Sequence, residues 1–246
     1  MKIDIIGKGN VGTHLATALK DAADVASVSS RTLEGLRKGS DIYLISVADD
    51  AIADVASQVA THIPSQAILA HTSGSTPLNA ISGIHNLTGV FYPLQTFSKN
   101  VSLDYADIPF FIEGCDSHTH DILCEAARLV SPSVYSADSE KRRDLHVASV
   151  LSCNFVNHLW ALASGYLSEK DLPFDALKPL IRETTRKIQT ASPLDVQTGP
   201  AARHDLKTIE AHMERLNGKQ ELKEIYRLLT LSIIRTDDNR HNRNKI

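Results

Sequence analysis

The sequence predicts an α/β fold, in which a Rossmann-type doubly wound parallel sheet is followed by an all-α C-terminal domain. Three observations predict it. Short β-branched runs alternate with helix-like stretches as far as Ser136, which is typical of parallel strands joined by crossover helices. One run, IYLISV at 42–47, is apolar almost throughout, as strands buried on both faces are. Helical periodicity replaces the strand pattern after Ser136, so we place the domain boundary between residues 136 and 137.

The expected elements follow from these patterns. Strands are expected at 3–6, 25–29, 42–47, 67–71, 89–91 and 110–112, with helices at 11–21, 50–62 and 118–130. In the second domain a long helix at 140–168 precedes helices at 174–190, 204–217 and 219–235, separated by prolines and by Gly199-Pro200. A polar tail is expected after the last helix.

The composition is that of a folded globular protein. Hydrophobic residues make up 42% of the 246 and charged residues 22%, which excludes a disordered chain. No apolar run approaches the ~20 residues that span a bilayer, and the first ten residues do not resemble a signal peptide. The three cysteines lack CxxC spacing. They argue against a disulfide framework and for a reducing, cytoplasmic location, and we expect no metal site.

Charge is distributed unevenly along the chain. Residues 1–136 hold 8 Lys and Arg against 14 Asp and Glu, and residues 137–246 hold 18 against 15. Nucleic-acid binding usually needs a concentrated basic face, so we expect neither nucleic acid nor a membrane as a partner. A small-molecule substrate is expected instead.

A glycine motif follows the first expected strand. Residues 7–12, Gly-Lys-Gly-Asn-Val-Gly, have the spacing GxGxxG and precede an amphipathic helix. In a dinucleotide site Gly7 would allow the tight turn, Gly9 would let the pyrophosphate approach the backbone, and Gly12 would let helix and strand pack closely. The helix N-terminus would then bind phosphate. The cofactor-binding candidates here are Gly7, Gly9, Asn10, Val11 and Gly12, and a glycine-rich turn without a ligand is the alternative.

The end of the second strand indicates which dinucleotide binds. An NAD site usually has Asp or Glu there, whereas this chain has Ser29-Ser30-Arg31-Thr32. Arg31 pairs well with phosphate, so Ser30 and Arg31 favour the 2′-phosphate of NADP. An exposed surface arginine is the alternative. Asp24 lies too early in its strand to bind the ribose.

Several segments of the sequence together resemble a known family. GKGNVGTHLATAL, LISVADDAI, AHTSGSTPL, GVFYPLQTFSK and QTGPAARHD are similar to a two-domain bacterial family described as NADP oxidoreductases, with a Rossmann-like domain and a helical domain of unknown function. That family is similar to the β-hydroxyacid dehydrogenases, 6-phosphogluconate dehydrogenase, ketopantoate reductase and pyrroline-5-carboxylate reductase. The resemblance covers essentially the whole chain. It implies a fold and a cofactor class, NADP, but no substrate.

The resemblance also implies two loops of the site. The loop Val47, Ala48 and Asp49 is expected to pass beside the cofactor, although the family usually has proline where this chain has Ala48. Ser73 and Gly74 match a Ser-Gly element that touches the substrate beside the nicotinamide. From the residues alone, TSGS is simply a polar turn.

The segment Tyr92-Pro93-Leu94-Gln95-Thr96-Phe97 has two interpretations. Its mixture of aromatic, aliphatic and polar side chains suits a pocket wall. A loop packed between domains would have the same composition.

The long helix supplies the candidate chemistry. An apolar stripe contains Ala148, Leu151, Phe155, Leu159, Leu162 and Tyr166, and neutral polar residues lie across from it. Relatives commonly place a Lys and an Asn here, but Lys141 and Lys170 lie only at the ends. Histidine can donate a proton near neutrality, so His146 is the candidate general acid, with Asn154 and Asn157 orienting the substrate. Residues that satisfy one another or a domain interface are the alternative.

The segment QTGPAARHD supplies the last candidate. Thr198 can cap a helix that begins near Pro200, and Arg203 could bind a substrate carboxylate or phosphate in bidentate fashion. A surface pair between Arg203 and Asp205 is the alternative.

These features predict an NADP-dependent oxidoreductase that transfers a hydride between nicotinamide and a small polar carbonyl, alcohol or imine. Residues 1–136 would bind the dinucleotide, and residues 137–246 would form a helical domain for substrate and homodimer contacts. A non-catalytic NADP(H)-binding sensor or scaffold is the alternative, because the superfamily lysine is missing.

Overall fold

The computed structural model describes residues 1–99 and 101–243, with side chains to Arg240. The chain divides into two compact units, Met1–Phe155 and Val156–Ile246, and each is described separately. The predicted domain boundary after residue 136 coincides with the end of the last strand, and it stays a prediction.

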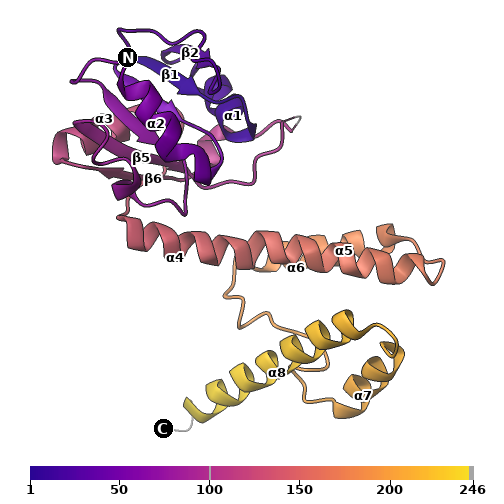
Figure 1. Ribbon diagram of the computed structural model, residues 1–246. Helices are drawn as coiled ribbons and strands as arrows, with labels where there is room; N and C mark the ends of the chain where they lie inside the picture. Colours follow the sequence, from indigo (N-terminus) through magenta and orange to yellow (C-terminus); the bar gives the residue numbers. More distant parts are fainter. Residues whose placement is uncertain (100, 244–246) are drawn as a thin grey trace. The chain divides into compact units, whose positions relative to one another are not determined.

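The first unit contains a seven-stranded sheet, and Figure 1 shows it flanked by helices. Its strands are β1 (Lys2–Ile6), β2 (Asp24–Val28), β3 (Ile42–Ile45), β4 (Ile68–His71), β5 (Leu87–Pro93), β6 (Phe110–Gly114) and β7 (Val134–Ser136). Their order is β2-β1-β3-β4-β5-β6-β7. Strands β1 to β5 are parallel, whereas β6 pairs with β5 antiparallel and β7 pairs with β6 parallel. The predicted Rossmann-type fold is confirmed, but β6 and β7 depart from a wholly parallel sheet.

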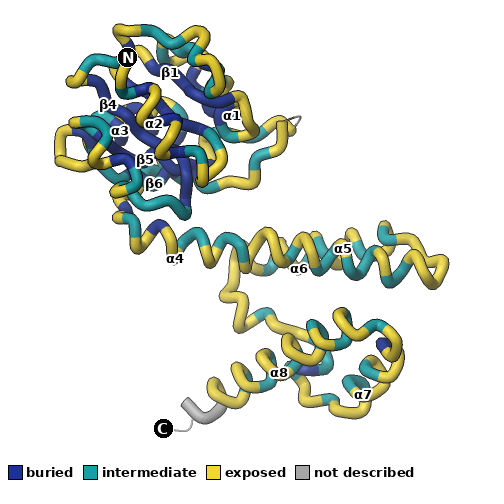
Figure 2. Tube along the Cα trace, in the orientation of Figure 1, coloured by how far each residue is buried: buried dark blue, intermediate teal, exposed yellow. Residues whose placement is uncertain are grey.

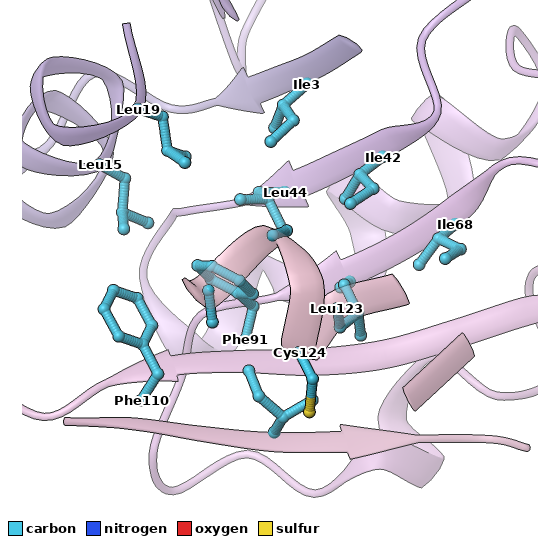
Figure 3. Packing of buried hydrophobic residues seen from close by; sticks show 14 of the residues in the cluster. Ile3, Leu15, Leu19, Ile42, Leu44, Ile68, Phe91, Phe110, Leu123 and Cys124 are labelled. Atoms are coloured by element: carbon cyan, nitrogen blue, oxygen red, sulfur yellow. The ribbon is translucent and has the colours of Figure 1, made fainter. Parts of the chain in front are cut away.

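Helices cover both faces of this sheet, as a doubly wound fold requires. On one face α1 (Asn10–Leu19) and α3 (Ser117–Arg128) pack through one buried cluster, part of which Figure 3 shows around Leu44 and Phe91. On the other face α2 (Ile52–Ala60) packs through a second cluster. The run at 42–45 is fully buried, because its side chains point alternately into the two clusters.

The long helix is continuous but not uniform. α4 (Ser139–Ser149) runs into a π-helical turn at Val150–Asn154, which leads into α5 (Phe155–Ser168). The side chain of Asp138 caps α4 by accepting from Lys141 N at 2.8 Å. The π turn was not predicted, and it changes which side chains share a face of the helix.

The second unit contains α5 from Val156 on, α6 (Lys178–Lys187), α7 (Leu206–Arg215) and α8 (Gln220–Arg243). The predicted helices are therefore confirmed, although α8 continues past residue 235 into the expected polar tail, of which 244–246 lie outside the described residues. Figure 2 shows exposed and intermediate positions along most of these helices. Among the helices of the described part, none has the length and apolar character that crossing a bilayer requires.

Candidate active site

The carboxyl ends of β1, β3, β4 and β5 meet at one edge of the sheet. Parallel pairing aligns Ile6 with Ile45, Ile45 with His71 and His71 with Val90. The loops that follow these strands are therefore neighbours, and they contain the glycine motif, Val47–Asp49, the HTSGS segment and the YPLQTF segment. In open α/β sheets, ligands bind at this edge.

The glycine turn has the geometry that the motif predicted. Gly7 has a φ of +122°, and a Cβ there would lie 2.0 Å from the Ser46 carbonyl oxygen. A Cβ on Gly12 would lie 2.3 Å from the Gly7 oxygen, so helix and strand approach as closely as expected. A Cβ on Gly9, by contrast, would meet nothing within 4 Å. The open space over Gly9, beside a helix N-terminus without a side-chain cap, fits a pyrophosphate.

Helix α1 also holds the loop that follows β5. The side-chain amide of Asn10 donates to the Phe97 oxygen at 2.9 Å. His14 is buried, and its ring accepts from the Tyr105 hydroxyl at 2.9 Å and donates to the Ser98 oxygen at 2.9 Å. Val11 packs against the core cluster beneath. The glycine motif and the YPLQTF segment are thus parts of one assembly.

The residues predicted to bind the adenosine end of NADP lie in the loop after β2. Ser30 is half-buried and Arg31 is exposed, and within the described residues Arg31 has no hydrogen-bond or ion-pair partner. Asp24 is paired elsewhere, because Arg37 binds both Asp24 and the buried Asp4 at 2.7 Å. Arg31 is therefore free to meet a phosphate.

The loop after β4 is held by buried polar contacts. Ser73 Oγ accepts from the backbone N–H groups of Ser75 and Thr76 at 3.2 and 3.0 Å, so its hydroxyl shapes the turn. Ser75 donates to Asp49 in the neighbouring loop, beside the half-buried Val47 and the exposed Ala48. A Cβ on Gly74 would lie 2.5 Å from the Tyr92 ring, and glycine lets that ring lie against the loop.

His71 is fully buried at the end of β4. Burial, together with repulsion by Arg142, lowers its pKa to about 4, against the opposing effects of the Pro77 carbonyl and Asp49. The ring is therefore neutral at physiological pH. Its Nδ1 accepts from Ser73 N at 3.2 Å, which leaves the proton on Nε2, a fully buried atom.

Arg142, on the first turns of α4, is also fully buried. Its guanidinium pairs with the Glu113 carboxylate and donates to the carbonyls of Ser73, at 3.3 Å, and Thr76, at 2.6 Å. One side chain thus joins α4, β6 and the loop after β4. The spacing of four residues between Arg142 and His146 places both on one face of α4.

A cavity of about 530 Å³ opens between α4 and the loop after β5, a volume within the ordinary range for ligand sites. We call it the β5–α4 cavity. The strand side contributes Tyr92, Leu94, Gln95, Thr96 and Phe97, and the helix side contributes His146, Ser149, Ser152, Cys153 and Asn154. Its polar lining comes from two separate segments of the chain.

Tyr92 and His146 are in contact within this cavity. The Tyr92 hydroxyl lies 3.2 Å from His146 Nδ1, and burial raises the pKa of Tyr92, although Arg142 opposes the shift. The structure therefore brings His146 and Asn154 together with the YPLQTF segment, which forms a pocket wall. The π turn contributes Ser152, Cys153 and Asn154 to the helix side of the cavity.

Two predicted residues lie in the second unit. Asn157 lines a different groove, of about 470 Å³, with Trp160 and Phe174. Arg203 precedes α7. Their substrate-binding roles stay predictions.

Sequence reasoning missed three residues of this assembly: Arg142, His71 and the carboxylate of Glu113. For Arg142, the signal that the sequence offered was its i to i+4 spacing from His146. Nothing in the sequence shows that His71 is buried, or that Glu113 on a later strand pairs with Arg142. The role of Tyr92 as the neighbour of His146 was likewise not predicted.

The comparisons with known proteins fit this architecture. The model of a domain of unknown function, DUF2520, matches residues 108–233. The chain belongs to the DUF2520 family. No match was found among curated proteins. A Bacteroides fragilis structure named "putative NADP oxidoreductase BF3122" is 38% identical, with a TM-score of 0.87 over 95% of this chain and 98% of that one.

More distant structures share the fold of this DUF2520 protein. Protein TM1727 from Thermotoga maritima is 18% identical, with a TM-score of 0.75 over 97% of this chain and 99% of that one. A Plasmodium falciparum pyrroline carboxylate reductase with NADP bound is 13% identical, with a TM-score of 0.58 over 96% of this chain and 97% of that one. The family resemblance that the motifs predicted is confirmed.

Proposed function

We propose that this DUF2520 protein is an NADP-dependent oxidoreductase, which transfers a hydride between nicotinamide and a small polar carbonyl, alcohol or imine. The observation that carries the proposal is the open space over Gly9, on the sheet edge where the loop after β5 also lines the β5–α4 cavity. The name of the B. fragilis relative supports an NAD(P)-dependent oxidoreductase in general terms. The nicotinamide supplies the hydride.

The chain's own residues would bind the cofactor, orient the substrate and give it a proton. The turn at Gly7–Gly12 would hold the pyrophosphate, and Ser30 and Arg31 the 2′-phosphate. His146 would give the proton that a reduced carbonyl oxygen or imine nitrogen needs, and its contact with Tyr92 orients the ring. Asn154 and the Ser73 turn would orient the substrate.

Nucleotide titration tests the cofactor assignment. We expect wild-type protein to bind NADPH more tightly than NADH in calorimetry. Arg31→Ala should weaken NADPH binding by about 10- to 100-fold, because a charge-assisted hydrogen bond contributes about 1.5–3 kcal/mol, and should leave NADH binding unchanged. Lys38→Ala removes the same charge from an exposed site in the same loop and is the control. Folded protein that binds neither nucleotide would contradict the proposal.

Turnover tests the chemical step. On a panel of small aldehydes, ketones and imines, His146→Ala should lower NADPH consumption by about 10²- to 10⁴-fold, the usual contribution of a general acid, without changing the NADPH affinity. Unchanged turnover would exclude His146 as the proton donor. Tight NADPH binding by the wild type without turnover on any member would favour the sensor or scaffold.

We also propose that the helical unit pairs with that of a second copy. Among its described residues only Ala201 and Leu216 are buried hydrophobic side chains, whereas Leu180, Leu206 and Leu228 are 59–64% exposed. Helices of a stable unit bury their apolar faces. The same unit has an apolar groove of about 430 Å³ between α5, α7 and α8, so a second copy offers both the groove and the protruding side chains that could fill it.

A further inference from the structure

We propose that the β5–α4 cavity takes an uncharged polar substrate, with hydroxyl or amide groups beside the reacting carbonyl or imine, and discriminates against carboxylates and phosphates. This inference rests on the proposed function, because it names the substrate class of that site. It differs from the expectation that Arg203 clamps an anionic end.

The lining of the cavity is polar but carries no fixed charge. Gln95, Thr96, Ser149, Ser152 and Asn154 all line it, and no Asp, Glu, Lys or Arg side chain does so among the described residues. Sites for carboxylate or phosphate usually offer arginine, whose planar fork matches the anion. His146 also lines the cavity, but its charge is the proton that it passes to the substrate, so the lining holds no lasting countercharge, and an anion that loses water there meets a desolvation penalty.

The nearest buried cation is already neutralised. Arg142 lies one helical turn before His146 but has no exposed side-chain surface. Its donors are used by the Glu113 carboxylate and by the Ser73 and Thr76 carbonyls. Binding an anion there would require breaking a buried ion pair, which is costly.

The neutral lining offers donors and acceptors together. The Gln95 oxygen accepts from Thr96 N at 2.7 Å, which leaves its NH₂ group to donate. The hydroxyls of Ser149 and Ser152 donate to backbone oxygens at 2.7 and 3.3 Å, which leaves their lone pairs to accept. Hydroxyl and amide groups use both kinds of partner, whereas a carboxylate only accepts.

The cysteines make this testable without a known substrate. Cys153 lines the cavity and is exposed, Cys115 is exposed elsewhere, and Cys124 is buried. In a Cys115→Ser background, alkylation of Cys153 is measured by mass spectrometry with iodoacetamide, which is neutral, and with iodoacetate, which is anionic. The ratio of the two rates in urea-unfolded protein corrects for intrinsic reactivity. We expect the ratio of the iodoacetamide rate to the iodoacetate rate to be about ten times larger in the folded protein than in the unfolded protein. A tenfold ratio corresponds to about 1.4 kcal/mol of difference in free energy.

A charge variant sharpens the test. Ser152→Arg, which places a cation in the lining, should lower the iodoacetamide preference to the unfolded value or below it. Ser65→Arg adds the same charge at an exposed site before β4 and should leave the preference intact. A folded wild-type protein that shows no preference, or prefers iodoacetate, would overturn the proposal.

Turnover separates this inference from the proposed function. With NADPH, glycolaldehyde should be reduced at least tenfold more efficiently than glyoxylate, its carboxylate counterpart. Faster reduction of glyoxylate would overturn the neutral-substrate assignment while leaving the oxidoreductase intact. If neither is reduced but Cys153 prefers iodoacetamide, the assignment of the cavity's chemistry stands and the oxidoreductase is what loses support.

Discussion

Arg142 and Arg143 are adjacent in sequence and opposite in environment. Arg142 is fully buried and paired with Glu113, whereas Arg143 makes an exposed i,i+3 pair with Glu140. Arg142→Ala would leave the Glu113 carboxylate, which is mostly buried, without its countercharge and would release the Ser73 and Thr76 carbonyls. We expect a loss of about 3–5 kcal/mol in the free energy of unfolding, measured by urea denaturation.

Arg143→Ala is the matched control for that measurement. An exposed pair contributes about 0–1 kcal/mol, so this variant should unfold almost as the wild type does. If both variants lose the same free energy of unfolding, Arg142 does not join α4 to the loop after β4. If only Arg142→Ala loses stability, the loop beside the cavity depends on that one buried side chain.

At the scale of elements, the turn from β1 to α1 contains two glycines with different expected roles: Gly12 is needed for packing, and Gly9 for binding the cofactor. Gly9 has φ −74° and ψ −173°, which alanine adopts freely, and nothing obstructs a Cβ there. Gly9→Ala should therefore change stability by no more than about 0.5 kcal/mol and yet weaken NADPH binding at least tenfold, because its methyl group would occupy the space assigned to pyrophosphate.

Gly12→Ala provides the contrast within the same turn. Its Cβ would lie 2.3 Å from the Gly7 oxygen, so we expect destabilisation by about 1–3 kcal/mol. Thermal and urea unfolding report stability, and calorimetry with NADPH reports binding. If Gly9→Ala binds NADPH as tightly as the wild type, the space over Gly9 is not the pyrophosphate site.

The elements that the sequence predicted well are those with strong local signals. The run at 42–45 is buried on both faces, and the glycine spacing constrains its own turn. β7 was missed because it has three residues and is half exposed, so it has little apolar pattern. The antiparallel direction of β6 was missed because hydrophobic periodicity contains no information on strand direction.

The site was predictable only in part, because local sequence patterns show neither an irregular helical turn nor a contact between distant segments. His146 and Asn154 were read from a polar strip assuming regular α-helical spacing, but the π turn at Val150–Asn154 decides which residues line the cavity. Such a turn leaves no simple sequence mark. The contact between Tyr92 and His146 joins residues 54 positions apart, and local patterns cannot show which distant segments meet.

At the scale of the whole molecule, the two units differ in how well they bury their own apolar residues. The first unit has two buried clusters, one on each face of its sheet. The helical unit has two buried hydrophobic residues among its described positions. A hydrophobic core of that size would not offset the conformational entropy lost in ordering such a unit. This supports the proposal that a second copy covers the apolar faces of the helical unit.

The dimer proposal predicts that assembly and stability change together. Sedimentation of the wild type should show a dimer at micromolar concentration, and its unfolding midpoint should rise with protein concentration, because association stabilises the folded state by mass action. Leu228→Glu, in an exposed apolar position of α8, should shift the protein towards monomer and lower the midpoint. Leu129→Glu, at a position 40% exposed beside α3 in the first unit, should leave the dimer intact. A wild type that stays monomeric, with a concentration-independent midpoint, would mean that the apolar surface of the helices is covered within one chain.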